Sequence, residues 1–274
     1  MARKPAGVEG VLVKEVMTPK VVKVKPSDSI LSVGNTLAER RISGAVVIEN
    51  KKIVGVVSKE SFVASVKYLG ENPLESFKVR DFMTERYETA HVNEPLGDVV
   101  DRIVKSKQRV DRVLVLENGL LAGILTKTDI SRLYSKHAKG FLEVKDLMNE
   151  KPPVVYDIMP VTSILKHITL AKEKRVVVMG GQKVLGIVTA LDVSMALFEK
   201  LKVHKGKDPL DYLTLDEVIT LNPITISKHA DAAQAAKTMV EKKIGGLPVF
   251  NGKLSGLITK NDIIKGYKLF KDGK

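Results

Sequence analysis

Apolar and polar residues alternate in short stretches along the chain, and each stretch precedes a segment with helical periodicity. Val21–Val24 and Ile224–Ile226 alternate in the manner of short strands. The clearest helix is predicted over residues 232–243, where apolar positions recur at helical spacing: Ala232, Ala235, Ala236, Met239 and Val240. Gly245–Gly246 is expected to end this helix.

Two more strands and a second helix are predicted after each of these helices. In the last quarter of the chain, Leu247–Phe250 and Lys253–Leu254 flank Asn251–Gly252. Asn118–Gly119 and Gly180–Gly181 hold the matching places earlier, and such pairs accept the positive φ that a two-residue hairpin requires. The next helix is expected to begin near one of four hydroxyl residues: Ser58, Thr126, Thr189 and Thr259. A β-α-β-β-α pattern of about 60 residues is too small for a comfortable domain, so pairing of the copies is expected.

Two phrases recur four times and establish an internal repeat. The first, which we call the opening segment, reads Val-Lys-Glu-Val-Met-Thr at Val13–Thr18 and returns in three further places: Val79–Thr84, Val144–Asn149 and, drifted, Leu215–Thr220. The second begins at four glycines that lie 37 to 40 residues after the Met, or the Ile, of each opening segment: Gly55, Gly123, Gly186 and Gly256. A period of 65 to 71 residues with this steady offset indicates four copies of one structural unit.

These phrases resemble those of cystathionine β-synthase (CBS) domains. The resemblance rests on the opening segment, the Leu-Pro-Val strand at Leu247–Val249 and the Gly-apolar-apolar-Thr-x-x-Asp phrase, and it covers about Val11 to Lys268. It implies an α+β fold of four repeats at residues 9–70, 75–138, 141–203 and 211–270. The repeats are expected to pair into two Bateman modules, 9–138 and 141–270, with nucleotide clefts between the paired repeats. Four repeats in one chain are similar to stand-alone archaeal CBS proteins and to the gamma subunit of AMP-activated protein kinase.

The Thr-x-x-Asp motif has two interpretations, which the sequence leaves open. Thr can cap the first turn of a helix, with the acid completing a capping box. The same site can instead attract an anion to the helix N-terminus, while the carboxylate accepts bonds from two ribose hydroxyls. The family resemblance implies the ribose role for three pairs: Thr126 with Asp129, Thr189 with Asp192, and Thr259 with Asp262. Repeat one departs from the motif because Ser61 stands in place of the acid, and Glu60 is expected to cap that helix.

Cationic candidates for binding phosphate lie just before the second strand of two repeats. Arg112 and Arg175 hold this position in repeats two and three, with Lys174 beside the latter, whereas Gly44 and Gly246 hold it in the other two. In related CBS pairs basic side chains at this place reach phosphates, and the guanidinium fork suits that task. A surface ion pair is the alternative role for both arginines.

Composition narrows the partners but does not identify one. The 274 residues carry a formal net charge of +13, which favours anionic partners, although lysines spread through every segment also fit a solvated basic surface. The complete lack of Cys excludes disulfides and thiolate sites and suggests a cytoplasmic protein. Abundant Lys with little Gln leans toward a thermophilic source. No apolar run approaches the roughly 18 residues needed to span a bilayer.

We therefore expect a non-catalytic regulatory protein that binds AMP, ADP or ATP and requires no cofactor. The five histidines have no metal-ligand spacing, and no acid, base and nucleophile set can be assembled. S-adenosylmethionine is the alternative ligand, although its sulfonium cation suits a basic cleft poorly. A nucleic-acid-binding regulator is the alternative class, although only 13 aromatic residues could stack on bases. A separate effector protein is expected to receive the signal. Four repeats can close a disk within one chain, and two chains can also pair as a homodimer.

Overall fold

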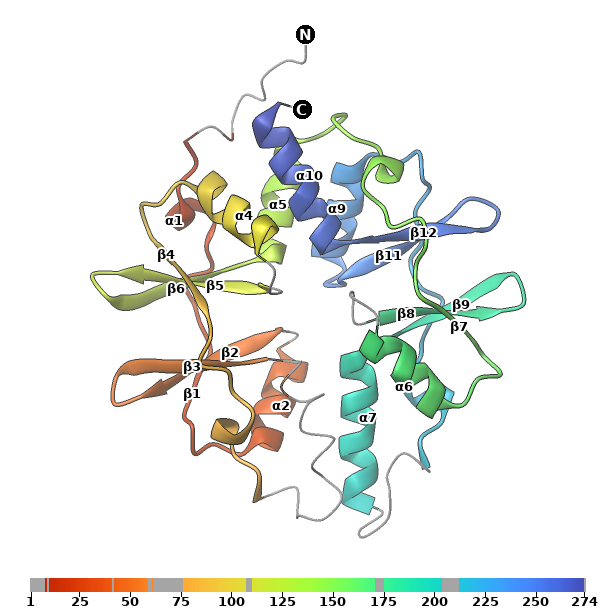
Figure 1. The fold of residues 1–274 in the computed structure, drawn as a ribbon, viewed down its shortest axis with the longest axis horizontal. Coiled ribbons are helices and arrows are strands. Elements are labelled where there is room, and N and C mark those ends of the chain that lie inside the picture. The colour runs from red at the N-terminus through yellow and green to blue at the C-terminus, as the bar shows by residue number, and fades with distance from the viewer. Residues whose placement is uncertain are drawn as a thin grey trace. The chain divides into compact units, whose positions relative to one another are not determined.

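The computed structural model confirms the α+β class and describes residues 8, 10–40, 42–58, 61, 76–106, 110–170, 175–203 and 212–273 (Figure 1). Repeat one contains β1 (Lys23–Val24), α2 (Ile30–Glu39), β2 (Gly44–Glu49) and β3 (Lys52–Ser58). Repeat two contains β4 (Glu88–His91), α4 (Leu96–Lys105), β5 (Arg112–Glu117), β6 (Leu120–Thr126) and α5 (Lys127–His137). Repeat three contains β7 (Val154–Tyr156), α6 (Val161–Leu170), β8 (Arg175–Gly180), β9 (Lys183–Thr189) and α7 (Ala190–Val203). Repeat four contains α9 (Ala232–Glu241), β11 (Gly246–Phe250), β12 (Leu254–Thr259) and α10 (Lys260–Asp272).

Each repeat forms a small sheet whose last two strands are an antiparallel hairpin. In repeats one to three, the first strand runs parallel to the second, because a helix connects them and returns the chain to the same edge. In repeat four the predicted strand at Ile224–Ile226 is reduced to one parallel bridge between Ile226 and Val249. None of the helices that the structure describes is long and apolar enough to cross a membrane.

The hairpin turns match the prediction fully in repeat two alone. Asn118 and Gly119 have φ of 49° and 77°, as a two-residue turn with positive φ at both positions requires. In repeat three the turn lies one residue later than predicted, because Gly180 still pairs with Lys183. In repeat four the loop has three residues, because Phe250 pairs with Leu254 and the strand register shifts there.

The end of α9 also differs from the prediction. The residue in the left-handed conformation is Lys243, with φ of 55°, and the Ile244 N–H donates to the Met239 carbonyl at 3.0 Å. This backbone bond closes the helix end in the way a Schellman motif does. Gly246 is therefore the first residue of β11 and does not end the helix.

The opening segments are exchanged between neighbouring repeats. The first forms α1 (Val13–Val16), and its Thr18 pairs with Ile124 in β6 of repeat two. Thr84, which opens repeat two, pairs with Val56 in β3 of repeat one. The other two segments exchange likewise: Asn149 pairs with Leu257 in repeat four, and β10 (Thr220–Leu221) pairs with β9 in repeat three. Each hairpin therefore gains its outer edge from the other member of a pair.

This exchange explains the recurring glycine. A Cβ atom at Gly186 would lie 2.6 Å from the carbonyl oxygen of Thr220, and one at Gly55 would lie 2.7 Å from that of Thr84. The corresponding distances are 3.0 Å for Gly123 from Thr18 and 2.7 Å for Gly256 from Asn149. Only glycine leaves room for the exchanged backbone, so the two phrases recur together because they contact each other.

Gly186→Ala is therefore expected to destabilise the protein by about 1–3 kcal/mol, since backbone atoms cannot move aside as a flexible side chain can. Thermal and urea unfolding would measure the loss. Gly97→Ala in α4 is the matched control, because its new methyl group would meet chiefly the flexible end of Lys271. Equal stability of Gly186→Ala and the wild type would refute the close contact.

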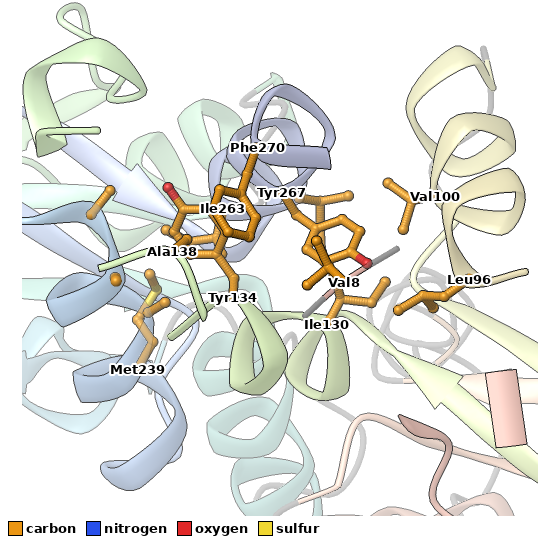
Figure 2. Packing of buried hydrophobic residues seen from close by; sticks show 14 of the residues in the cluster. Val8, Leu96, Val100, Ile130, Tyr134, Ala138, Met239, Ile263, Tyr267 and Phe270 are labelled. Carbon is orange, nitrogen blue, oxygen red and sulfur yellow. The ribbon is translucent and has the colours of Figure 1, made fainter. Parts of the chain in front are cut away.

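The chain folds as two compact bodies. The first contains Met1–Val21, Tyr87–Lys151 and Ile224–Lys274, and the second contains Val22–Arg86 and Pro152–Pro223. In the first body, repeats two and four share one core in which α5 packs against α9 and α10 (Figure 2). In the second body, the sheets and helices of repeats one and three surround their own apolar clusters. The grouping of repeats into modules 9–138 and 141–270 stays a prediction.

Two tyrosines in the first core are buried with their hydroxyl groups. Tyr134 on α5 and Tyr267 on α10 are both fully buried, and neither hydroxyl has a hydrogen-bond partner among the described residues (Figure 2). Burial raises the pKa of Tyr267 to about 12 and raises that of Tyr134 as well, because a phenolate would be poorly solvated there.

These tyrosines predict a loss of stability in alkali. The neutral form is favoured in the folded protein, so the stabilisation is complete below the unfolded pKa of about 10 and is lost as the pH rises from there through the folded value. Tyr267→Phe removes the contribution of Tyr267 to this loss, leaves that of Tyr134, and is expected to be as stable as wild type at pH 7 or more stable by about 1 kcal/mol. Urea unfolding at pH 7 and pH 11 would measure both, and a variant that loses stability equally with the wild type at pH 11 would contradict the explanation.

Candidate functional site

The three predicted Thr–Asp pairs lie at the N-termini of α5, α7 and α10 and cap them. In each pair, Oδ2 of the Asp accepts the backbone N–H of the Thr at 2.9 Å. The same oxygen accepts the Thr hydroxyl at 2.6 Å in repeats two and three and at 2.7 Å in repeat four. The predicted capping interaction is thus present, and it uses one of the two carboxylate oxygens.

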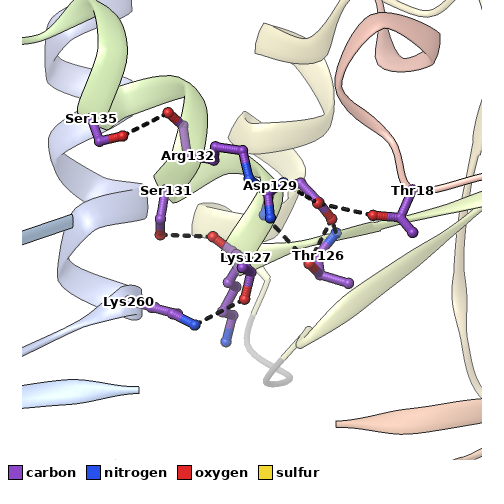
Figure 3. Close-up of polar contacts among 9 residues, drawn as sticks. Thr18, Thr126, Lys127, Asp129, Ser131, Arg132, Ser135 and Lys260 are labelled. Carbon is purple, nitrogen blue, oxygen red and sulfur yellow. Dashed lines mark hydrogen bonds and ion pairs between the residues drawn. The ribbon is translucent and has the colours of Figure 1, made fainter. Parts of the chain in front are cut away.

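The second oxygen, Oδ1, has different partners in each repeat. In repeat two, Oδ1 of Asp129 accepts Nη1 of Arg132 at 2.9 Å and the hydroxyl of Thr18 at 3.1 Å (Figure 3). In repeat four, Oδ1 of Asp262 accepts Nζ of Lys265 at 3.1 Å. In repeat three, none of the residues that the structure describes donates to Oδ1 of Asp192. Asp129 and Asp262 are buried, whereas Asp192 is partly exposed.

Repeat one lacks the carboxylate, as its sequence predicts. The hydroxyl oxygen of Ser61 accepts the backbone N–H of Ser58 at 3.1 Å, so Ser61 takes over the capping bond of the missing acid. Ser61 is buried. Glu60, which was expected to cap this helix, lies outside the described residues. Serine supplies a cap without the charge that a ribose clamp needs.

The strand register places the two candidate arginines opposite the caps. Arg112 pairs with Thr126 and Arg175 pairs with Thr189, each at the start of its hairpin. Residues directly opposite each other in an antiparallel pair project to the same face of the sheet, with Cβ atoms about 5 Å apart. A guanidinium, a hydroxyl and a carboxylate are thus gathered at one end of each hairpin. Arg112 is buried and Arg175 is half-buried, while Lys174 lies outside the described residues.

Two lysines that the sequence analysis did not single out connect repeats two and four. Nζ of Lys127 donates to Oδ1 of Asn261 at 2.6 Å. Nζ of Lys260 donates to the hydroxyl of Thr128 at 2.9 Å (Figure 3). Lys127 also bonds to Asp111 at 2.6 Å. Both lysines follow the capping Thr directly, and this shared Thr-Lys-x-Asp spelling was the available signal.

Nothing in the described part of the chain forms a metal centre. No group of three or more His, Asp or Glu side chains among the described residues could hold a metal ion. His229 contacts Glu143 at 3.3 Å on an exposed surface, and Glu143 also pairs with Lys145. The arrangement at the caps offers acceptors and cations for binding, with no base placed to activate a nucleophile among the residues described there.

The model of the CBS domain matches four segments of the chain: 13–68, 79–136, 144–199 and 215–268. Among curated relatives, an uncharacterized protein of Methanocaldococcus jannaschii (MJ1404) is 29% identical over 265 residues, which are 92% of this chain and 61% of the relative. The chain spans about two fifths to three fifths of the length of the first curated relatives it matches.

Solved structures show the same fold over nearly the whole chain. Protein MJ1225 of M. jannaschii, described as a proposed archaeal homologue of γ-AMPK, is 20% identical with a TM-score of 0.82, covering 94% of this chain and 100% of that one. A conserved protein of Pyrococcus horikoshii has 20% identity and a TM-score of 0.64 over the same shares. At this level of identity the likeness concerns the fold alone.

Proposed function

Because the chain belongs to the CBS domain family, with four domains over most of its length, we propose that it is a non-catalytic regulatory protein that binds adenine nucleotides. AMP, ADP or ATP is the proposed ligand, bound in clefts between repeats paired within residues 9–138 and 141–270. The crossed opening segments support this pairing, since they join repeat one to two and repeat three to four. The absence of Cys fits a cytoplasmic protein.

The observation that carries the proposal is the Thr–Asp cap with an arginine directly across the hairpin. The carboxylate can accept the two hydroxyls of a ribose, and the helix N-terminus and guanidinium favour the phosphates that follow. The same cations disfavour S-adenosylmethionine, which carries a sulfonium charge. The nucleotide would favour one orientation of the paired repeats and so bias a separate effector protein.

Direct titration tests this function. The protein is unfolded and refolded to remove bound ligand, and calorimetry then measures binding of ATP, ADP, AMP, adenosine and S-adenosylmethionine. Saturable binding of at least one adenine nucleotide is expected, and its absence for every adenosyl compound would defeat the proposal. Mass spectrometry of small molecules released from the freshly purified protein would identify the natural ligand. Tight binding of nucleic acid that weakens steeply with salt would favour the alternative class.

Arg175→Met is expected to weaken ATP binding about tenfold or more while leaving adenosine binding within about twofold, because charge-assisted bonds to phosphate are lost. Lys183→Met is the matched control, since Lys183 is an exposed cation at the far end of the same hairpin, opposite Gly180. Equal losses for ATP and adenosine in Arg175→Met would argue against the phosphate role.

A further inference from the structure

The three capping carboxylates differ in how much hydrogen-bonding capacity remains. An ionised carboxylate accepts about four hydrogen bonds, two on each oxygen. In all three repeats, two of these places are used by the backbone and side chain of the capping Thr. A ribose diol donates two hydrogen bonds, so it needs both places on Oδ1.

Counting only hydrogen bonds from the described residues, Asp129 has no acceptor position left, Asp262 has one and Asp192 has two. Thr18 and Arg132 fill Oδ1 of Asp129, and Lys265 fills half of Oδ1 of Asp262. No described residue donates to Oδ1 of Asp192. Asp192 is also the most exposed of the three acids.

The residue one turn after the acid explains part of this difference. Arg132 and Lys265 stand three residues beyond their acids and form ion pairs with them at 2.9 and 3.1 Å. In repeat three the same position is Met195, whose side chain has no N–H or O–H to donate and packs against the apolar cluster of repeat one. Asp192 is therefore left without a neighbouring cation on its own helix.

The exchanged opening segment explains the rest. Thr18 and Thr220 are equivalent residues, since each pairs with the isoleucine after the recurring glycine, Ile124 and Ile187 respectively. Of these two residues, only Thr18 donates its hydroxyl to the acid of the repeat that its segment joins. No hydrogen bond joins Thr220 to Asp192 in the structure.

We propose that Asp192 forms the strongest ribose site of this chain and that Thr18 and Arg132 keep the Asp129 site closed. The inference rests on the proposed function and adds an order of filling: repeat three, then repeat four, then repeat two. A ligand at Asp129 has to displace two existing contacts, which weakens binding by about tenfold for each contact displaced.

Calorimetric titration with adenosine tests the order, because adenosine has no phosphate and reports the ribose contacts alone. Asp192→Asn is expected to weaken the tightest site at least tenfold, whereas Asp129→Asn leaves it within about twofold. The double variant Thr18→Val/Arg132→Met vacates Oδ1 of Asp129 and is expected to add one binding site per chain. Thr220→Val, the matched control, adds none.

Circular dichroism and thermal melting show whether each variant is folded, and the added site gives a readout that loss of folding cannot imitate. The inference is overturned if the tightest site survives in Asp192→Asn, if Asp129→Asn weakens it equally, or if the double variant gains no site. Absence of adenosyl binding by the wild type would overturn the proposed function, and this inference with it. Normal wild-type binding with the wrong order overturns the inference alone.

Discussion

Phe270→Ala is expected to destabilise the first compact body by about 3–5 kcal/mol, the range for removing a large aromatic side chain from a core. Phe270 is 5% exposed and lies near the end of α10 in repeat four. Its ring meets that of Tyr134 in repeat two edge-on, with centroids 6.2 Å apart (Figure 2). It also meets the ring of Phe141, the first residue of repeat three, edge-on, with centroids 5.1 Å apart. The substitution therefore opens a cavity between two repeats that share one core.

Urea unfolding with amide hydrogen exchange in α5 and α9 would measure this effect. Phe270→Leu is the matched control, because leucine keeps much of the volume and is expected to lose less than half as much stability. A loss below about 1 kcal/mol for the alanine variant would mean that the core collapses around the vacancy, contrary to the close packing seen here.

Val79→Ala is expected to loosen repeat one more than repeat two, the repeat whose sequence contains Val79. The side chain is fully buried in the apolar cluster of repeat one, and its backbone N–H donates to the carbonyl of Asp28 at 2.9 Å. Val13→Ala is expected to loosen repeat two, although Val13 belongs to repeat one in the sequence. Its side chain is buried in the core that contains repeat two, and its backbone N–H donates to the carbonyl of Glu94 at 3.0 Å. Each truncation is expected to cost about 2–3 kcal/mol through a cavity.

Residue-resolved hydrogen exchange shows whether an opening segment stabilises the neighbouring repeat or its own repeat. Val79→Ala is expected to speed exchange at Val56 in β3 and to leave the β5–β6 hairpin unchanged. Arg80→Ala and Lys14→Ala remove exposed neighbours and are expected to stay within about 0.5 kcal/mol of wild type. Faster exchange confined to β5 and β6 in Val79→Ala would show that the opening segment serves its own repeat.

Local chemistry made much of the fold predictable from the sequence. Asn118–Gly119 specifies a turn because both residues tolerate positive φ, and the alanine-rich stretch at 232–243 specifies a buried helix face. The turn in repeat three was predicted one residue too early. Either Gly180 or Gly181 can adopt a positive φ, and only the strand pairing across the hairpin determines which of them does. The end of α9 was predicted too late, because Lys243 adopts the left-handed conformation that glycine usually adopts at a helix end.

The capping pairs of the site could be predicted from the sequence, but the contacts of the second carboxylate oxygen of each Asp could not. Thr-x-x-Asp spacing is a local signal, so all three capping pairs follow from the sequence. The hydrogen bond from Thr18 to Asp129 joins residues 111 positions apart. The repeated sequence gives the order of the repeats, but it does not show which repeat each opening segment packs against. Arg132 and Lys265 were within reach of local reasoning, since residues three apart on a helix are neighbours.

Crossed opening segments also limit how such a chain can grow or be divided. A fragment cut between repeats one and two would remove the residue that pairs with the outer edge of each hairpin, Thr84 beside Gly55 and Thr18 beside Gly123. The exposed edges could then pair with another chain. A gene that gained a single repeat would encode a hairpin with the same unpaired edge. A duplication that lengthens such a protein is therefore expected to add two repeats at a time. The smallest unit that can fold by itself is a pair of repeats that exchange their opening segments.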